Sequence, residues 1–345
     1  MFKAFKILLL SLSLFFFYTC YQTNPNALKP DFVTEQTLID TDDPAIWVNP
    51  NDPMQSLILG TDKGDENGGV YIFDLKGKLQ KSITGLKRPN NIDVEYGLMM
   101  PDSQRMDIAV YTERGINKIR VLKLPEMEYI DNGGIEVFEG VTEREPMGIG
   151  LYKKANTGEV FAIVGRKIGP DGAYLWQYRL NVDSTNIVKG EAVRKFGAFK
   201  GTKEIESIAV DDALGYVYYS DEGAGVRKYY ADPDSSNSEL ALFASKDFTE
   251  DHEGISIYTT SERTGYILVS DQQSNRFHVF TRESPHQRVA IIPVSTNESD
   301  GSEVTNIAFG NLYPKGFFIA MSDDRTFQIY KWEQLEALIL QKAKQ

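Results

Sequence analysis

Short apolar runs recur along the chain at a spacing of about fifty residues, with Gly, Asn and Asp between them. Six of these runs read as equivalent strands, and their starts lie 49, 56, 51, 51 and 50 residues apart. Short strands rich in aromatic and β-branched residues, repeated at this period, are typical of the blades of a β-propeller. The six runs are Val70–Asp74, Ile119–Leu124, Leu175–Leu180, Val226–Ala231, Phe277–Arg282 and Phe327–Trp332.

Each of the first five repeats fills out to four strands, and the first repeat begins with Ala45–Val48. The sixth repeat begins with Thr305–Phe309 and supplies only three strands before Glu333–Lys344, whose apolar residues fall on one side of a helix. The strand-like segment Phe32–Ile39 precedes the first repeat, and pairing it with the sixth would remove an open sheet edge. The sequence therefore predicts an all-β, six-bladed β-propeller with four-stranded blades, in which an N-terminal strand closes the last blade.

The amino terminus has the composition of an export signal. Two lysines in Met1–Lys6 precede the apolar run Ile7–Tyr18, which is too short to span a bilayer comfortably. Cys20, the single cysteine of the chain, closes this run as in a loose lipobox, although an ordinary cleaved signal is the alternative. We predict a signal peptide at 1–19, a tether at 20–30 and the propeller domain at 31–345. Export to the periplasm or cell surface, with lipidation of Cys20, follows from this prediction.

The net charge of the chain argues against one class of partner. The formal net charge is −12, with 49 acidic and 37 basic residues, which argues against a nucleic-acid partner. The acids are also placed regularly. In an antiparallel blade the loop leading into the first strand and the loop leaving the second lie at the same end, so these loops should crowd one mouth of the central channel. Residues in these positions include Asp42, Asp43, Lys63, Asn90, Asn91, Arg114, Glu145, Arg166, Lys167, Glu206, Glu222, Asp251, Glu253, Gln272 and Asp300.

So many carboxylates in one semi-enclosed place require compensating positive charge. Calcium is the natural candidate because it accepts six to eight oxygen ligands in loose geometry. A zinc or copper site would require His or Cys ligands. His252, His278 and His286 lie far apart in the sequence, so they do not form a recognisable ligand set. Basic residues from the first three repeats at the same mouth favour an anionic ligand such as a phosphate ester.

Two segments resemble a known family. Asp42–Trp47 (DDPAIW) and Asn90–Asp93 (NNID) are similar to the signature segments of the β-propeller phytases, and the resemblance runs in order from about Asp40 to Trp332. The resemblance implies a secreted, calcium-dependent phosphoric monoester hydrolase that acts on calcium complexes of phytate. It also implies direct attack on phosphorus by a calcium-bridged water, without a covalent intermediate.

Site residues are carried over by position. The resemblance implies catalytic roles for Lys63, Arg114, Lys167 and Glu206, and substrate contacts from Lys63, Arg114, Arg166 and Lys167. The implied calcium ligands are Asp42, Glu206, Glu222, Asp251, Glu253, Gln272 and Asp300. The chain departs from the family pattern in having Glu95 in place of arginine, Met147 in place of tyrosine, Ile168 in place of an acid, Asn306 in place of aspartate and Ser207 in place of glycine.

Other functions remain open at this point. One is a calcium-dependent lactonase or phosphotriesterase on the same fold, although such sites would not need basic groups from three consecutive repeats. A second is a non-catalytic lipoprotein that binds inositol phosphates, and a third is an interaction scaffold. We expect a monomer.

Overall fold

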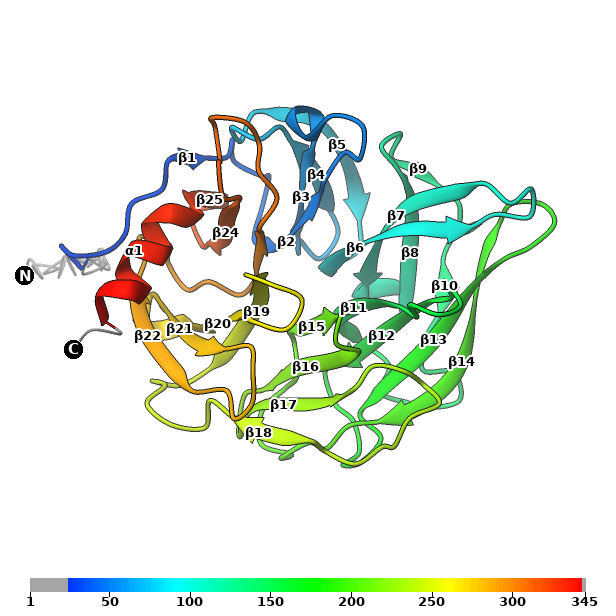
Figure 1. Cartoon of the computed structure of the whole chain (residues 1–345). Coiled ribbons are helices and arrows are strands. Elements are labelled where there is room, and N and C mark those ends of the chain that lie inside the picture. The colour runs from blue at the N-terminus through cyan, green and yellow to red at the C-terminus, as the bar shows by residue number, and fades with distance from the viewer. Residues whose placement is uncertain (1–23, 343–345) are drawn as a thin grey trace, which may run out of the picture.

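The computed structural model describes residues 24–342, which form six antiparallel sheets arranged in a ring (Figure 1). The predicted six-bladed β-propeller is therefore confirmed. The first strands of successive blades contact one another around the central axis, and the later strands of each blade lie further out. The signal peptide predicted for 1–19 and the lipidation site at Cys20 lie outside the described residues. Within the described part of the chain, no helix is long and apolar enough to cross a membrane.

The blades follow one another along the chain. Blade 1 contains β2 (Thr41–Trp47), β3 (Leu57–Asp62), β4 (Gly68–Phe73) and β5 (Leu79–Leu86); blade 2 contains β6 (Pro89–Met99), β7 (Arg105–Glu113), β8 (Lys118–Leu124) and β10 (Ile135–Glu136), with β9 (Glu128–Tyr129) paired to β8. Blade 3 contains β11 (Pro146–Lys153), β12 (Val160–Arg166), β13 (Leu175–Val182) and β14 (Val188–Phe196); blade 4 contains β15 (Ile208–Asp211), β16 (Tyr216–Asp221), β17 (Gly225–Tyr230) and β18 (Ala241–Phe243). Blade 5 contains β19 (His252–Thr259), β20 (Gly265–Asp271), β21 (Arg276–Thr281) and β22 (Arg288–Pro293); blade 6 contains β23 (Ser302–Thr305), β24 (Phe317–Ser322), β25 (Thr326–Lys331) and β1 (Phe32–Val33). Short 3₁₀ turns are η1 (Pro53–Gln55), η2 (Arg114–Ile116) and η3 (Gln272–Ser274), and α1 is Trp332–Lys342.

The ring closes through the N-terminal segment, as the sequence predicts. Phe32 pairs with Ile329, so β1 becomes the fourth strand of blade 6 beside β25. The strand itself spans only two of the eight predicted residues, but the backbone N–H groups of Thr34 and Thr37 continue to donate to blade 6 carbonyls. Leu28, within the predicted tether, also bridges to Val294 of blade 5. Chain closure therefore involves more than the short strand alone.

Apolar side chains pack between neighbouring blades. Phe327 of blade 6 lies so close to Gly60 of blade 1 that a Cβ at residue 60 would stand 2.2 Å from the ring. Glycine is required there because the backbone of one blade approaches the side chain of the next. At the C-terminus, Leu335 and Ile339 of α1 are buried against blades 5 and 6, which confirms the predicted apolar face of this helix.

Several predicted strand boundaries are wrong. β6 begins at Pro89 and β19 at His252, so Asn90, Asn91 and Glu253 lie within the strand starts rather than in the loops before them. Two further corrections also bear on the site. β2 begins at Thr41 rather than Ala45, with an irregular register between Thr41 and Pro44, so Asp42 and Asp43 lie within a bulged strand end. In blade 6 the first strand is Ser302–Thr305, not Thr305–Phe309. Asn306 consequently follows that strand and donates hydrogen bonds to Thr259 at the end of β19, so it does not lead into the strand. The apolar residues that follow Thr305 have the sequence pattern of a strand, but β24 pairs with Ser302–Thr305 instead.

Candidate active site

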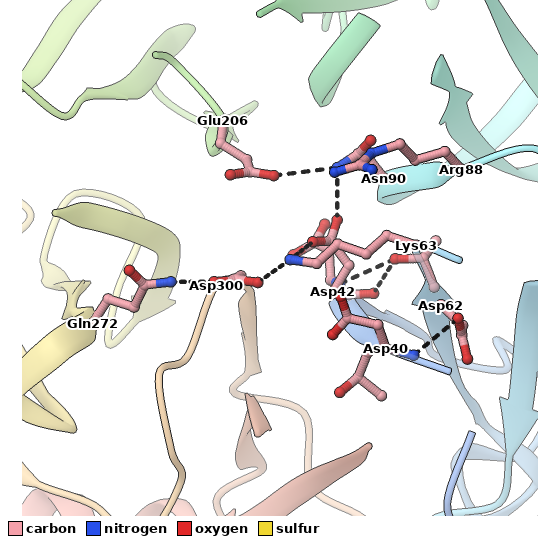
Figure 2. Close-up of polar contacts among 12 residues, drawn as sticks. Asp40, Asp42, Asp62, Lys63, Arg88, Asn90, Glu206, Gln272 and Asp300 are labelled. Atoms are coloured by element: carbon pink, nitrogen blue, oxygen red, sulfur yellow. Dashed lines mark hydrogen bonds and ion pairs between the residues drawn. The ribbon is translucent and has the colours of Figure 1, made fainter. Parts of the chain in front are cut away.

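The acidic mouth is formed by loops at one end of the blades, where the first strands begin and the second strands end. Lys63 directly follows β3, and its backbone N–H donates to Asp40 O at 2.7 Å. Thr61 Oγ1 accepts from the Asp43 N–H at 3.0 Å, which fixes the bulged start of β2 against β3. These bonds hold the Asp42 side chain and the Lys63 side chain on the same side of blade 1 (Figure 2).

Lys63 connects carboxylates from two blades. Its Nζ lies 3.0 Å from Asp42 Oδ1 and also pairs with Asp300 of blade 6. Gln272, which begins η3 in blade 5, donates its amide to the other oxygen of Asp300 (Figure 2). Although burial by itself lowers the pKa of the Lys63 ammonium, the charges of Asp42 and Asp300 raise that pKa well above its usual value. The lysine is therefore a permanent cation between two buried carboxylates.

Asn90 extends the cluster across the mouth. Its Nδ2 lies 3.2 Å from Glu206 Oε1 and 3.4 Å from Asp42 Oδ2, so one amide links blade 4 to blade 1 (Figure 2). Asn90 is buried, and its Oδ1 has no hydrogen-bond partner among the residues described. A buried amide oxygen without a partner is costly unless a cation or water satisfies it.

The blade 4 side of the mouth contains further carboxylates. Glu222 follows β16, and burial raises its pKa to about 8, with the charges of Glu204 and Asp251 acting in the same direction. Burial and the charge of Asp42 raise the pKa of Glu206 well above its ordinary value, and Glu253 of β19 behaves similarly because it is buried near Glu206. Without positive charge, these groups retain protons at pH values where carboxyls are normally ionised.

The side chains at the mouth offer oxygen ligands for a hard cation. Glu222 Oε1 and Glu253 Oε2 are buried and have no hydrogen-bond partner within residues 24–342, like Asn90 Oδ1. Glu204, Glu206 and Glu222 each place one carboxylate oxygen within 4.8 Å of the others. Carboxylate and amide oxygens in this spacing suit a hard divalent cation. The residues present therefore fit a metal that binds oxygen ligands.

Besides Lys63, three basic residues were predicted to contact the substrate, and they lie in different surroundings. Arg114 begins η2, and its Nη2 lies 3.2 Å from Glu145 Oε1. Lys167 follows β12, with Nζ 3.1 Å from Glu204 Oε2. The guanidinium of Arg166 is buried, lies 4.9 Å from the centre of the Phe138 ring and donates to Glu143 O. Lys167 thus remains exposed at the rim, whereas the Arg114 side chain is only 9% exposed, and Arg166 is directed into contacts between blades.

The remaining predicted ligand, Asp251, pairs with Lys203 and accepts from Gln273 Nε2 at 2.7 Å. Lys203 and Glu204 were not singled out from the sequence, yet both contact predicted site residues. Lys203 stands three residues and Glu204 two residues before Glu206 in the same loop, and that position was the signal available to find them. The structure thus adds one carboxylate and one ammonium to the predicted mouth.

Below the mouth, the first strands enclose a narrow cavity of about 100 Å³ whose lining includes Asp43, Asp93 and Glu303. Burial raises the pKa of Asp93 to about 7 and that of Glu303 to about 8. Glu95, which stands where the signature has arginine, is also buried, and its carboxyl hydrogen-bonds to that of Asp212. Carboxyl groups therefore continue along the channel, and without positive charge their raised pKa values keep them protonated near neutral pH.

Comparison with known proteins is consistent with this geometry. A family model described as Phytase matches residues 26–341. A 3-phytase of Bacillus subtilis (strain 168) is 28% identical over 318 residues, covering 85% of this chain and 80% of that protein. A solved structure, that of the Dos1 propeller, gives a TM-score of 0.43 at 10% identity over 84% of this chain and 67% of that chain. This last likeness is too low to inform function. Because the family model spans nearly all of the described propeller, the chain belongs to the phytase family.

Proposed function

We propose that this phytase-family protein hydrolyses phosphate monoesters of phytate, in the manner of a 3-phytase, and that it requires calcium ions held at the acidic mouth. The observation that carries the proposal is the set of buried oxygens without partners, Asn90 Oδ1, Glu222 Oε1 and Glu253 Oε2, beside cationic side chains at the same opening. Such a set gains stability from a cation, and the cation in turn attracts a polyphosphorylated ligand.

Calcium is preferred over softer metals because of the donor chemistry. The ligands that we assign are Asp42, Glu206, Glu222, Asp251, Glu253, Gln272 and Asp300, all of which supply oxygen. The ring nitrogens of the buried His252 face backbone carbonyls rather than the mouth: Nε2 lies 2.6 Å from Ala244 O and Nδ1 lies 3.3 Å from Glu222 O. No cluster of His or Cys among the described residues competes with the oxygen set.

Each side chain has a distinct role in the proposed reaction. When bound, calcium supplies positive charge to phosphate oxygens and acidifies water. Arg114 presents a planar guanidinium that can hold two phosphate oxygens at once, and Lys63 and Lys167 add point charges at the phosphate. Glu206 is held by Asn90, which fixes its carboxylate to orient the attacking water. Arg166 supports the rim from its buried position rather than by direct contact.

Phosphate release from phytate tests the proposal. The chain from Gln22 to Gln345 should release inorganic phosphate with millimolar calcium and lose that activity in excess chelator. Release should also fall sharply in Lys63→Ala and Arg114→Ala. Calcium-independent release would overturn the metal requirement. If phytate binds in calcium but no phosphate appears, the protein is a capture protein for inositol phosphates, the second candidate.

We further propose that the protein is exported and anchored through Cys20, and that it is monomeric. The support is the N-terminal pattern of lysines, apolar run and cysteine. Metabolic labelling with a fatty acid, compared between the wild type and Cys20→Ser, tests the anchor. Equal labelling of both proteins would refute it, and size-exclusion chromatography of the chain without its signal tests the oligomeric state.

A further inference from the structure

We propose that Glu204 is an additional ligand of the cation held by Glu206 and Glu222, and that binding this cation releases Lys167 from Glu204 so that Lys167 can contact substrate phosphate. The inference rests on the proposed function. It adds that Glu204 exchanges the Lys167 ammonium for the bound cation. Glu204 lies outside the ligand set that the sequence predicts.

The geometry of the three carboxylates fits a shared cation. One oxygen from each of Glu204, Glu206 and Glu222 lies within 4.8 Å of the other two. Calcium–oxygen distances are about 2.3–2.6 Å, so two oxygens on one ion stand at most about 5 Å apart. The three side chains therefore need little movement to contact a single ion.

A second observation points to a ligand at this position. Glu222 is only 7% exposed, and its Oε1 has no hydrogen-bond partner in the described chain. Glu204 Oε2 is also buried and accepts no hydrogen bond from the described residues, although Lys167 Nζ lies 3.1 Å from it as an ion-pair partner. Two buried carboxylate oxygens without hydrogen bonds within the three-carboxylate group are what a bound cation would satisfy.

Lys167 connects this cation position to the substrate. Its Nζ lies 3.1 Å from Glu204 Oε2, and the two side chains are 39% and 27% exposed. Together with Ile168 and Lys203 they line an open hollow of about 310 Å³ that also reaches Glu222. An ion pair in contact with solvent contributes little stability, so a divalent cation can take the Glu204 carboxylate from a single ammonium. The freed lysine then faces this hollow at the rim.

This arrangement couples the two ligands. Calcium removes the partner that neutralises Lys167, and phosphate bound to Lys167 removes the ammonium that competes for Glu204. Linkage requires the effect to be reciprocal, so each ligand raises the affinity for the other by the same factor.

Calcium titration calorimetry without substrate tests the inference. Glu204→Gln keeps the shape of the side chain but removes its charge, and it should weaken calcium binding about tenfold or more, as expected when a ligand carboxylate is lost. Glu250→Gln is the matched control, because Glu250 is an exposed acid in the loop before Asp251. Lys167→Met should bind calcium more tightly than the wild type because the competing ammonium is gone. Thermal unfolding of each variant in chelator verifies that it folds.

Inorganic phosphate, titrated with and without calcium, measures the coupling. In the wild type, calcium should strengthen phosphate binding, and in Glu204→Gln phosphate affinity should depend less on calcium because Lys167 is already free. Unchanged calcium affinity in Glu204→Gln would overturn the inference and leave Glu204 as a holder of Lys167. A wild type that binds calcium through Glu204 but releases no phosphate would refute hydrolysis while leaving this inference intact. A wild type that binds no calcium would refute both.

Discussion

Replacing Lys63 by methionine removes the only ammonium that bridges Asp42 and Asp300 within the described residues. The methionine retains most of the aliphatic stem, so the main change is electrostatic. In the wild type Lys63 Nζ lies 3.0 Å from Asp42 Oδ1 and pairs with Asp300, and both aspartates are buried. The variant leaves two buried carboxylates beside each other without a counter-ion.

The expected loss is large in the absence of metal. Removing one partner of a buried ion pair costs about 3–5 kcal/mol, because the remaining charge is buried and unpaired. The loss should depend on pH in a definite direction. Burial raises the pKa of Asp300 to about 6 even though Lys63 lowers it, so removing Lys63 raises this pKa further. The variant should therefore be destabilised less at pH 5, where Asp300 can take up a proton, than at pH 8.

Urea unfolding in chelator and in calcium measures both effects. We expect Lys63→Met to be about 3–5 kcal/mol less stable than the wild type in chelator at pH 8. Calcium should recover most of this loss, because a cation between Asp42 and Asp300 replaces the missing ammonium. The gain in stability from calcium should therefore be larger in the variant than in the wild type. Phosphate release should nevertheless stay low, because the phosphate contact proposed for Lys63 is lost.

The matched control is Lys76→Met, which removes an exposed lysine from the turn between β4 and β5. It should change neither stability nor its dependence on calcium. If Lys63→Met were as stable as Lys76→Met in chelator, Lys63 would not be compensating the aspartates. An equal gain from calcium in the wild type and the variant would show that the cation binds elsewhere.

Three further predictions concern other parts of the molecule. Arg114→Lys should lower kcat/KM for phytate about 10–100-fold, equivalent to about 1.5–3 kcal/mol, because lysine cannot make the two parallel hydrogen bonds to phosphate. Steady-state phosphate release measures this change, and an unchanged kcat/KM would contradict the proposed role of Arg114. Burial raises the pKa of Glu95 to about 9, whereas in the unfolded chain the pKa is 4.5, so between these pH values only the folded protein keeps the proton. The stability of the wild type should therefore fall relative to that of Glu95→Gln as the pH rises from 4.5 to 9. Urea unfolding at pH 5 and 8.5 measures this difference, and parallel pH dependence of the two proteins would refute it. Deleting residues 24–37 removes β1 and exposes the edge of β25. At about 1 kcal/mol each, the loss of six backbone hydrogen bonds to the rest of the chain should cost roughly 6 kcal/mol and promote aggregation. A truncated chain with the same unfolding midpoint would show that closure contributes nothing.

The blade pattern was readable from the sequence because each strand is a local feature. Alternation of apolar and polar residues, turn residues between runs and a regular period together specified six four-stranded units. The segment that completes blade 6 could be predicted by counting strands. The sixth repeat lacked a fourth strand, and the strand-like N-terminal segment had no partner strand of its own. The same local pattern failed at residues 305–309, where an apolar run after the true strand imitated it.

The membership of the acidic mouth was also largely determined by sequence, because the strand order of a blade fixes which loops share one end. What the sequence could not determine is which atoms from different blades lie within a few ångströms of one another. That Lys63 pairs with Asp42 and Asp300, and that Glu204 stands between Lys167 and Glu206, depends on how the closed ring tilts and spaces its blades. Electrostatic interactions vary steeply with distance and burial, so the partners of each charge were decided only by the tertiary structure.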